Sequence, residues 1–204
     1  MIPKTTPKKR IIVHLGNVGY DSARKTRTYA DRFNEFKFVG IDKKNIHAHT
    51  TNKVSIPKNL KQIESEFLTG ILKLKDKSVD LITSDFAVGH YALKEKEKIH
   101  GSFGSPKTYL SHKEYTERIM QLCYNKLKVG GKAIFVVFVS PLEENNALGN
   151  IKLGIKNIPF QKVDVQTLSP EKLKNISSHW SRFLGMSVIE GQEPYKFYRI
   201  TLVK

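Results

Sequence analysis

The sequence predicts a doubly wound α/β domain, in which helices pack on a mostly parallel sheet. Apolar runs typical of buried strands recur along the chain and alternate with segments whose apolar residues have helical spacing. Strands that alternate with helices favour parallel pairing. Two strand patterns follow each other directly near the C-terminus, which favours an antiparallel hairpin there. The strand patterns lie at residues 10–15, 37–42, 78–85, 133–139, 161–168, 186–190 and 196–203.

The first two strand patterns frame a predicted helix. Residues 10–15 are mainly β-branched and apolar, and Gly16 begins a turn directly after them. Residues 22–36 are more polar, and the second strand pattern stops at an acid, Asp42. Four side chains in the segment between the strands have the spacing of one helix face: Ala23, Tyr29, Ala30 and Phe33.

The central part of the chain combines a strong strand pattern with a basic segment. Residues 78–85 predict a central strand that leads into a functional loop. Residues 92–112 are basic and rich in turn residues, so we expect an insertion or a mobile loop. A helix is predicted from about residue 113 to 126, and the paired glycines Gly130 and Gly131 predict its C-terminal cap and turn.

The C-terminal third has fewer regular patterns. Residues 141–159 are rich in Asn and Gly and predict a loop. Ser169 followed by Pro170 is typical of a helix N-cap and first helical position, and the apolar spacing continues to Phe183. The last two strand patterns then predict a closing hairpin around residues 191–194.

Composition favours one compact domain. The chain has 204 residues, of which 39% are hydrophobic, a size usual for a single core. No apolar run approaches the roughly 20 residues of a membrane-spanning helix, so we expect no membrane association. Residues 1–10 form a basic tail without the apolar stretch of a secretory signal. The single cysteine, Cys123, lies in a helical pattern and is interpreted as a packed residue of an intracellular, reducing compartment, with a nucleophile or metal ligand as the alternative.

Net charge points to a polyanionic partner. The chain carries 35 Lys and Arg against 19 Asp and Glu, a formal charge of +16 at pH 7. A field of this sign attracts phosphates, and their neutralisation releases counterions. Nucleic acid, with RNA favoured, is therefore the leading partner hypothesis, and a ribonucleoprotein partner is a second one. The alternative is that the lysine-rich composition reflects biased codon usage and a solvated surface.

Residues at the ends of the predicted strands are the first candidates for a site. In a doubly wound sheet, ligands bind outside the carboxyl ends of the strands. Gly16 and Gly19 allow the backbone to approach a ligand closely. Asp42 is placed to accept hydrogen bonds from ribose hydroxyls. Each signal has a plain alternative, because the glycines could form an ordinary turn and Asp42 could cap a helix.

Three longer segments resemble one family. They are residues 74–82, residues 127–135, and the terminal pair 183–188 with 195–200. In order and spacing they resemble the fourth strand, the glycine turn with the fifth strand, and the final hairpin of class I S-adenosylmethionine-dependent methyltransferases. The resemblance extends from about Ile11 to Val203. It implies a Rossmann-like, seven-stranded sheet with an antiparallel C-terminal hairpin strand.

The resemblance also implies a cofactor and its site. The cofactor is S-adenosylmethionine, with Gly16 in the glycine-rich loop, Asp42 at the ribose and Glu66 at the adenine. Asp85 begins the family's fourth motif, near the meeting point of methyl group and substrate. The positions expected to bind the cofactor are His14, Gly16, Gly19, Asp42, Glu66 and Asp85.

Residues after Asp85 are the candidates for substrate recognition. The stretch 86–91 resembles a motif of messenger-RNA cap guanine-N7 methyltransferases, and its aromatic and histidine side chains could stack on a purine. Phe86 could equally pack under the loop. The expected catalytic residues are Asp85, His90 and Tyr91, and the expected substrate-binding residues are Phe86, Lys94, Lys96 and Lys107.

The glycine-rich motif departs from the family pattern. His14 stands where the family has an acid, and Val18 and Tyr20 replace its second and third glycines. Because a histidine cannot supply the carboxylate, two hypotheses stay open: an RNA methyltransferase, or a catalytically silent module that binds RNA or a ribonucleoprotein. A nicotinamide-dependent oxidoreductase is weaker, since no complete G-x-G-x-x-G is present. No metal is expected, because His47 and His49 lack a second ligand pair.

Overall fold

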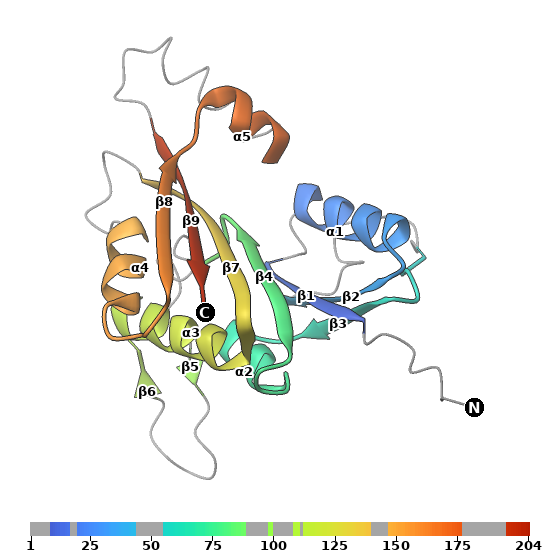
Figure 1. Ribbon diagram of the computed structural model, residues 1–204, viewed down its shortest axis with the longest axis horizontal. Helices are drawn as coiled ribbons and strands as arrows, with labels where there is room; N and C mark the ends of the chain where they lie inside the picture. Colours follow the sequence, from blue (N-terminus) through green and yellow to red (C-terminus); the bar gives the residue numbers. More distant parts are fainter. Residues whose placement is uncertain are drawn as a thin grey trace.

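The computed structural model describes residues 9–16, 20–43, 55–88, 98–99, 108–110, 112–139, 147–176 and 195–204. Seven of its strands form one sheet in the order β3-β2-β1-β4-β7-β9-β8, drawn in Figure 1. Six of them are parallel, whereas β9 runs antiparallel between β7 and β8. The strands are β1 (Arg10–Leu15), β2 (Phe36–Asp42), β3 (Leu60–Glu64), β4 (Val79–Asp85), β7 (Leu127–Val139), β8 (Lys162–Thr167) and β9 (Lys196–Val203).

Helices pack on both faces of this sheet, as a doubly wound fold requires. Figure 1 shows α1 on one side of β1–β3 and α2 on the other. The main core joins Leu15 of β1 to Ile71 of α2, Ile119 of α3 and Ile151 of α4. The opposite face carries two smaller clusters, one under α1 and one under α5. The helices are α1 (Tyr20–Arg32), α2 (Phe67–Leu72), α3 (His112–Lys126), α4 (Ala147–Ile155) and α5 (Pro170–Ile176).

The helix predicted at residues 22–36 is confirmed as α1 with shifted bounds, and one of its predicted buried residues is exposed. Ala30 is fully buried against Phe38 of β2, as expected. Tyr29 is 44% exposed, however, and Thr26 is buried in its place. The prediction for Tyr29 was wrong because a tyrosine side chain is amphipathic and can lie at the surface. Thr26 was not predicted to be buried because threonine is polar, but it lies one turn before Ala30 on the same side of the helix.

The sequence patterns did not predict β3 or α2, and they predicted a loop where α4 lies. Strand β3 and helix α2 are short, so neither carries enough periodic residues to stand out. Helix α4 lies inside residues 141–159, where a loop was expected. Its buried residues Leu148, Ile151 and Ile155 have helical spacing, and this apolar stripe outweighs the Asn and Gly of the segment.

Gly130 and Gly131 do not cap α3, contrary to the prediction. Strand β7 begins directly at Leu127, and its pairing with β4 jumps from Val79–Leu127 to Leu81–Lys132. The extra residues form a bulge, in which Gly130 has a φ of +75°. The backbone N–H of Gly130 donates to the carbonyl of Lys204 at 2.6 Å, which ties the bulge to the end of β9.

The remaining predictions for single segments have mixed outcomes. The predicted insertion contains a short antiparallel ribbon, β5 (Lys98–Ile99) with β6 (Thr108–Tyr109). The predicted N-cap is confirmed, because the N–H of Lys172 donates to Ser169 Oγ at 3.4 Å. The predicted strand at 186–190 and the helical pattern beyond Ile176 lie outside the described residues. Of the helices described, none combines the length and apolar character needed to cross a membrane.

Cys123 is a core residue, as its helical setting predicted. Its side chain is fully buried in the main core. Burial raises the pKa of the Cys123 thiol to about 12. Because the thiolate is the reactive form, this cysteine is an inert packing residue rather than a nucleophile.

Candidate functional site

The candidate site lies at the sheet edge where β1, β2, β3 and β4 end. Strand order reverses here, because β2 and β3 lie on one side of β1 and β4 lies on the other. Ligands of doubly wound sheets bind at such a switch point. Four of the predicted positions gather at this edge, at or within two residues of a strand end: Gly16, Asp42, Glu66 and Asp85.

Gly16 joins the ends of β1, β2 and β4. Its φ is +78°, a left-handed conformation that glycine adopts without strain. Its N–H donates to the carbonyl of Ile41 at 2.9 Å, and a Cβ at this position would overlap the Cβ of Ala87. The close contact of these two loops therefore requires a glycine for two separate reasons.

The loops after β2 and β3 are joined in the same way. The N–H of Ser65 donates to the carbonyl of Asp42 at 2.8 Å, which places Glu66 beside the end of β2. Lys43 Nζ lies 3.2 Å from Glu66 Oε1, and both side chains are about 40% exposed. An exposed pair of this kind is weak and exchangeable. Glu66 can therefore release Lys43 to bind a polar group of a ligand.

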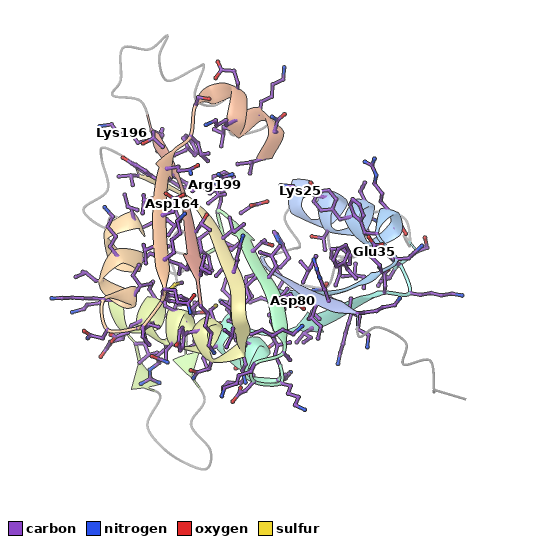
Figure 2. All side chains as sticks on the ribbon, viewed as in Figure 1. Lys25, Glu35, Asp80, Asp164, Lys196 and Arg199 are labelled. Carbon is purple, nitrogen blue, oxygen red and sulfur yellow. The ribbon has the colours of Figure 1, made fainter. Side chains whose placement is uncertain are left out.

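Asp85 forms an ion pair that the sequence did not reveal. Lys25 of α1 donates to Asp85 Oδ2 at 3.1 Å, and the two side chains are 28% and 15% exposed. Figure 2 shows Lys25 on the half of α1 that lies nearer to β4. The pair supplies both an anionic and a cationic group at the switch point. No local signal marks Lys25, because α1 carries several other basic residues.

His14 is buried on the same face of the sheet as Asp85. Its Nδ1 lies 2.7 Å from Thr83 Oγ1, on the adjacent strand β4. Burial lowers the pKa of the His14 imidazole, and Lys25 adds to this, while Asp85 and Asp42 raise it to a smaller extent. The ring is therefore neutral at pH 7. Its other nitrogen, Nε2, is buried, and the part of the chain that the structure describes gives it no hydrogen-bond partner.

Phe86 does not line the site as the substrate-stacking hypothesis required. Only 6% of its surface is exposed, and its ring packs edge-on against Phe197 of β9 at 5.9 Å. It belongs to the cluster beneath α5 that also contains Leu173. Its φ of +62° is strained for a phenylalanine, and this turn directs the side chain into the core. The alternative, packing beneath the loop, is the one that the structure supports.

The other predicted site residues lie outside the described part of the chain. They are Gly19 of the first loop, the candidate catalytic residues His90 and Tyr91, the candidate phosphate contacts Lys94, Lys96 and Lys107, and the histidines His47 and His49. Among the residues that are described, no group of three or more potential metal ligands gathers.

The strand order and the switch-point site define a class: the chain has the fold of class I S-adenosylmethionine-dependent methyltransferases. Phosphoethanolamine N-methyltransferase 2 of Haemonchus contortus, solved with S-adenosyl-L-methionine, superposes with a TM-score of 0.56 at 14% identity. Geranyl diphosphate C-methyltransferase of Streptomyces coelicolor, solved with S-adenosyl-L-homocysteine, gives 0.59 at 10% identity. These matches cover 98% and 96% of this chain, and 50% and 72% of the respective relatives.

The likeness defines the fold and leaves the reaction open. The chain spans only about half the length of the Haemonchus enzyme. A probable spermidine synthase of Corynebacterium glutamicum has the same fold, with a TM-score of 0.56 at 16% identity over 96% of this chain and 56% of its own. No protein-family model and no curated protein sequence matches the chain. Function therefore depends on the residues of the site itself.

Proposed function

We propose that the protein is an S-adenosylmethionine-dependent methyltransferase whose substrate is RNA. The observation that carries the first part is the convergence of Gly16, Asp42, Glu66 and Asp85 at the switch point of a methyltransferase-type sheet. These residues come from four separate segments of the chain. The hydrogen bonds of Gly16 to Ile41 and of Ser65 to Asp42 join the loops after β1, β2 and β3.

The residues of this edge fit the polar groups of the cofactor. Asp42 would accept hydrogen bonds from the ribose hydroxyls, and Glu66 would contact the adenine. Gly16 keeps the first loop free of a side chain where the loops meet. The buried Nε2 of His14, for which the described residues offer no hydrogen-bond partner, lies on the same face. When bound, S-adenosylmethionine supplies an electrophilic methyl group on its sulfonium.

Asp85, with Lys25 beside it, is the described candidate for a role in the chemistry. Methyl transfer depends mainly on holding the acceptor atom in line with the methyl group. Asp85 can orient the acceptor and take its proton, while Lys25 holds the carboxylate in place at 3.1 Å.

RNA as the substrate rests on charge. The net charge of +16 favours a polyanion, and exposed lysines lie at the same sheet edge as the site. Lys172 and Lys174 are on α5, and Lys196 begins the antiparallel strand β9. Figure 2 shows Lys196 near the ends of the strands on the α5 side. These cations can bind phosphates beside the proposed cofactor.

Calorimetry with S-adenosylmethionine tests the cofactor assignment. Asp42→Ala should abolish binding, because the ribose hydroxyls would lose their acceptor. The matched control is Asp31→Ala, which removes an exposed carboxylate on α1 and should leave affinity unchanged. Unchanged affinity in Asp42→Ala, with unchanged thermal stability, would contradict the proposal.

A catalytically silent RNA-binding module is the second candidate. It is favoured by the Lys25–Asp85 pair, which neutralises the proposed catalytic carboxylate, and by His14 in place of an acid. Transfer of labelled methyl groups to total RNA distinguishes the two functions. Incorporation that Asp85→Asn reduces supports the enzyme. Salt-sensitive RNA binding without incorporation or cofactor-dependent stabilisation supports the module.

A further inference from the structure

Arg199 of β9 lies in the same row of the sheet as Asp85 of the candidate site. Asp85 pairs with Val136 of β7, and Val136 pairs in turn with Arg199. Residues paired across neighbouring strands point to the same face of a sheet. Because neighbouring strands lie about 4.8 Å apart, the Cα atoms of Asp85 and Arg199 are separated by about 10 Å. Arg199 therefore faces the same side of the sheet as Asp85, two strands away.

The described part of the chain covers this face of the sheet incompletely. The face carries α1 over one end and α5 over the other, and Figure 2 shows Arg199 below α5. Ile134 and Thr201, which pair with each other on this face, are partly exposed, whereas the next pair, Phe135 and Ile200, is fully buried on the opposite face. Sheets of α/β proteins are normally covered on both faces. A ligand can therefore reach Arg199 from the side on which Asp85 lies.

The described residues hold the guanidinium of Arg199 in place without pairing it with a carboxylate. Its Nη2 donates to Gln166 Oε1 at 2.7 Å, and Gln166 Nε2 donates to Asp164 Oδ2 at 2.7 Å. A neutral amide therefore stands between the two charges. Arg199 Nε is buried, and none of the described residues accepts a hydrogen bond from it. Such atoms in native proteins indicate a partner that is missing, such as a ligand or a water.

The charge on this face favours an anionic ligand. On the side that Arg199 faces, the described residues of β7 and β8 contribute two exposed cations, Lys132 and Lys162, and one carboxylate, Asp164. Val136 borders Arg199 with apolar surface, and ionic contacts are stronger where water is excluded. A planar guanidinium binds two oxygens of a phosphate at once. Phosphate therefore fits Arg199 in both charge and geometry.

We propose that Arg199 binds a phosphate of the RNA substrate and so positions the nucleotide to be methylated beside Asp85. The inference rests on the proposed function, because RNA supplies the phosphate and Asp85 marks the site of methyl transfer. It goes beyond that function by assigning a substrate contact to β9, more than 100 positions after Asp85 in the chain.

Three variants test the contact. Arg199→Gln removes the charge and keeps a polar side chain, and Arg199→Lys keeps the charge but not the planar fork of donors. The matched control is Arg118→Gln, which makes the same change at an exposed position of α3, on the opposite face of the sheet. RNA affinity is measured by fluorescence anisotropy with a labelled single-stranded RNA at several salt concentrations. Affinity for S-adenosylhomocysteine is measured by calorimetry.

The expected loss is confined to RNA. Arg199→Gln should bind RNA about 10- to 100-fold more weakly, as expected for loss of a hydrogen bond between charged groups. Its slope of log affinity against log salt should fall by roughly one, and Arg199→Lys should recover part of the loss. In methyl transfer to RNA, KM should rise more than kcat falls. Affinity for S-adenosylhomocysteine should match the wild type, which also shows that the variant folds. Equal RNA affinities in Arg199→Gln and Arg118→Gln would overturn the inference.

Nitrogen-15 NMR of the Arg199 Nε–H provides a readout that does not depend on general charge. The signal is assigned by its loss in Arg199→Lys. The probe is a dinucleoside monophosphate, whose single phosphate leaves no choice of register, and its methylphosphonate analogue has the same bases without the charge. The charged dinucleotide should shift the signal and the uncharged one should not. Equal shifts with both probes would show that the bases, not the phosphate, contact this side chain.

The failure of this inference can be distinguished from the failure of the proposed function. If the wild type methylates RNA and Arg199→Gln does so with an unchanged KM, the inference alone is wrong. If the wild type binds no RNA at all, RNA as the substrate is wrong, and the phosphate assigned to Arg199 is wrong with it.

Discussion

At the residue scale, Gly16 and Gly130 form a natural comparison. Both have φ near +75°, so either substitution by alanine incurs the left-handed strain of about 1–2 kcal/mol. A Cβ added at Gly16 would also overlap the Cβ of Ala87, whereas a Cβ added at Gly130 would have no atom within 4 Å. We expect Gly16→Ala to cost a further 1–3 kcal/mol or so for overpacking, measured by urea unfolding.

The Gly16 prediction has an internal control. Adding Ala87→Gly to Gly16→Ala removes the overlapping methyl group. The double variant should therefore regain most of the stability lost to overpacking and should keep only the loss from backbone strain. Equal destabilisation by Gly16→Ala and Gly130→Ala would show that the two loops do not meet as described.

His14 should make folding stability depend on pH, and the sign follows from its burial. The pKa of His14 is lowered in the folded state relative to about 6.5 in the unfolded chain. Between these two values only the unfolded chain binds the proton, so stability falls as pH falls below 6.5. Subtracting the unfolding free energy of His14→Asn from that of wild type at pH 5–8 isolates this effect. A flat difference would contradict the burial of a neutral imidazole.

At the element scale, Asn59 links α1 to the sheet. Its side-chain amide lies 2.9, 3.1 and 3.2 Å from the carbonyls of Ala30, Phe33 and Phe36, at the end of α1 and the start of β2. Asn59→Ala would leave these carbonyls short of a donor, so we expect destabilisation of about 1–3 kcal/mol. Asn157→Ala, at an exposed turn after α4, should stay within about 0.5 kcal/mol. Equal unfolding midpoints for both variants would rule out the link.

Sequence patterns located elements well where burial is continuous. Strands β1, β4 and β7 are central, and their runs of apolar residues reflect burial on both faces. Edge strand β3 and helix α2 are short and half-exposed, so each contains too few apolar residues to form a recognisable repeat. The bulge at Gly130 could not be predicted, because it depends on pairing with β4 and on a bond to Lys204.

At the scale of the whole molecule, the effect of lysine position on RNA binding can be separated from the effect of net charge. We expect Lys172→Glu, Lys174→Glu and Lys196→Glu together to weaken RNA binding and to reduce the slope of log affinity against log salt, because each lost phosphate contact lowers it by roughly one. The change is measured by fluorescence anisotropy with a labelled single-stranded RNA at several salt concentrations.

The control triple has the same charge change at the opposite edge of the sheet. Lys73, Lys75 and Lys77 are exposed between α2 and β4, at the start of the parallel strands. Their replacement by Glu should lower affinity less, and only through the net charge. Equal losses of RNA affinity in both triple variants would mean that the overall field of the protein attracts RNA, and would contradict RNA binding beside the proposed site.

The sequence by itself determined the fold class and the positions where strands end, because both depend on local patterns of burial and turn residues. It therefore placed Gly16, Asp42 and Asp85 at the correct edge. Tertiary structure alone decided what surrounds them. The bonds of His14 to Thr83 and of Lys25 to Asp85 join residues 69 and 60 positions apart. Strand order and register bring such side chains together, and no local pattern carries that information.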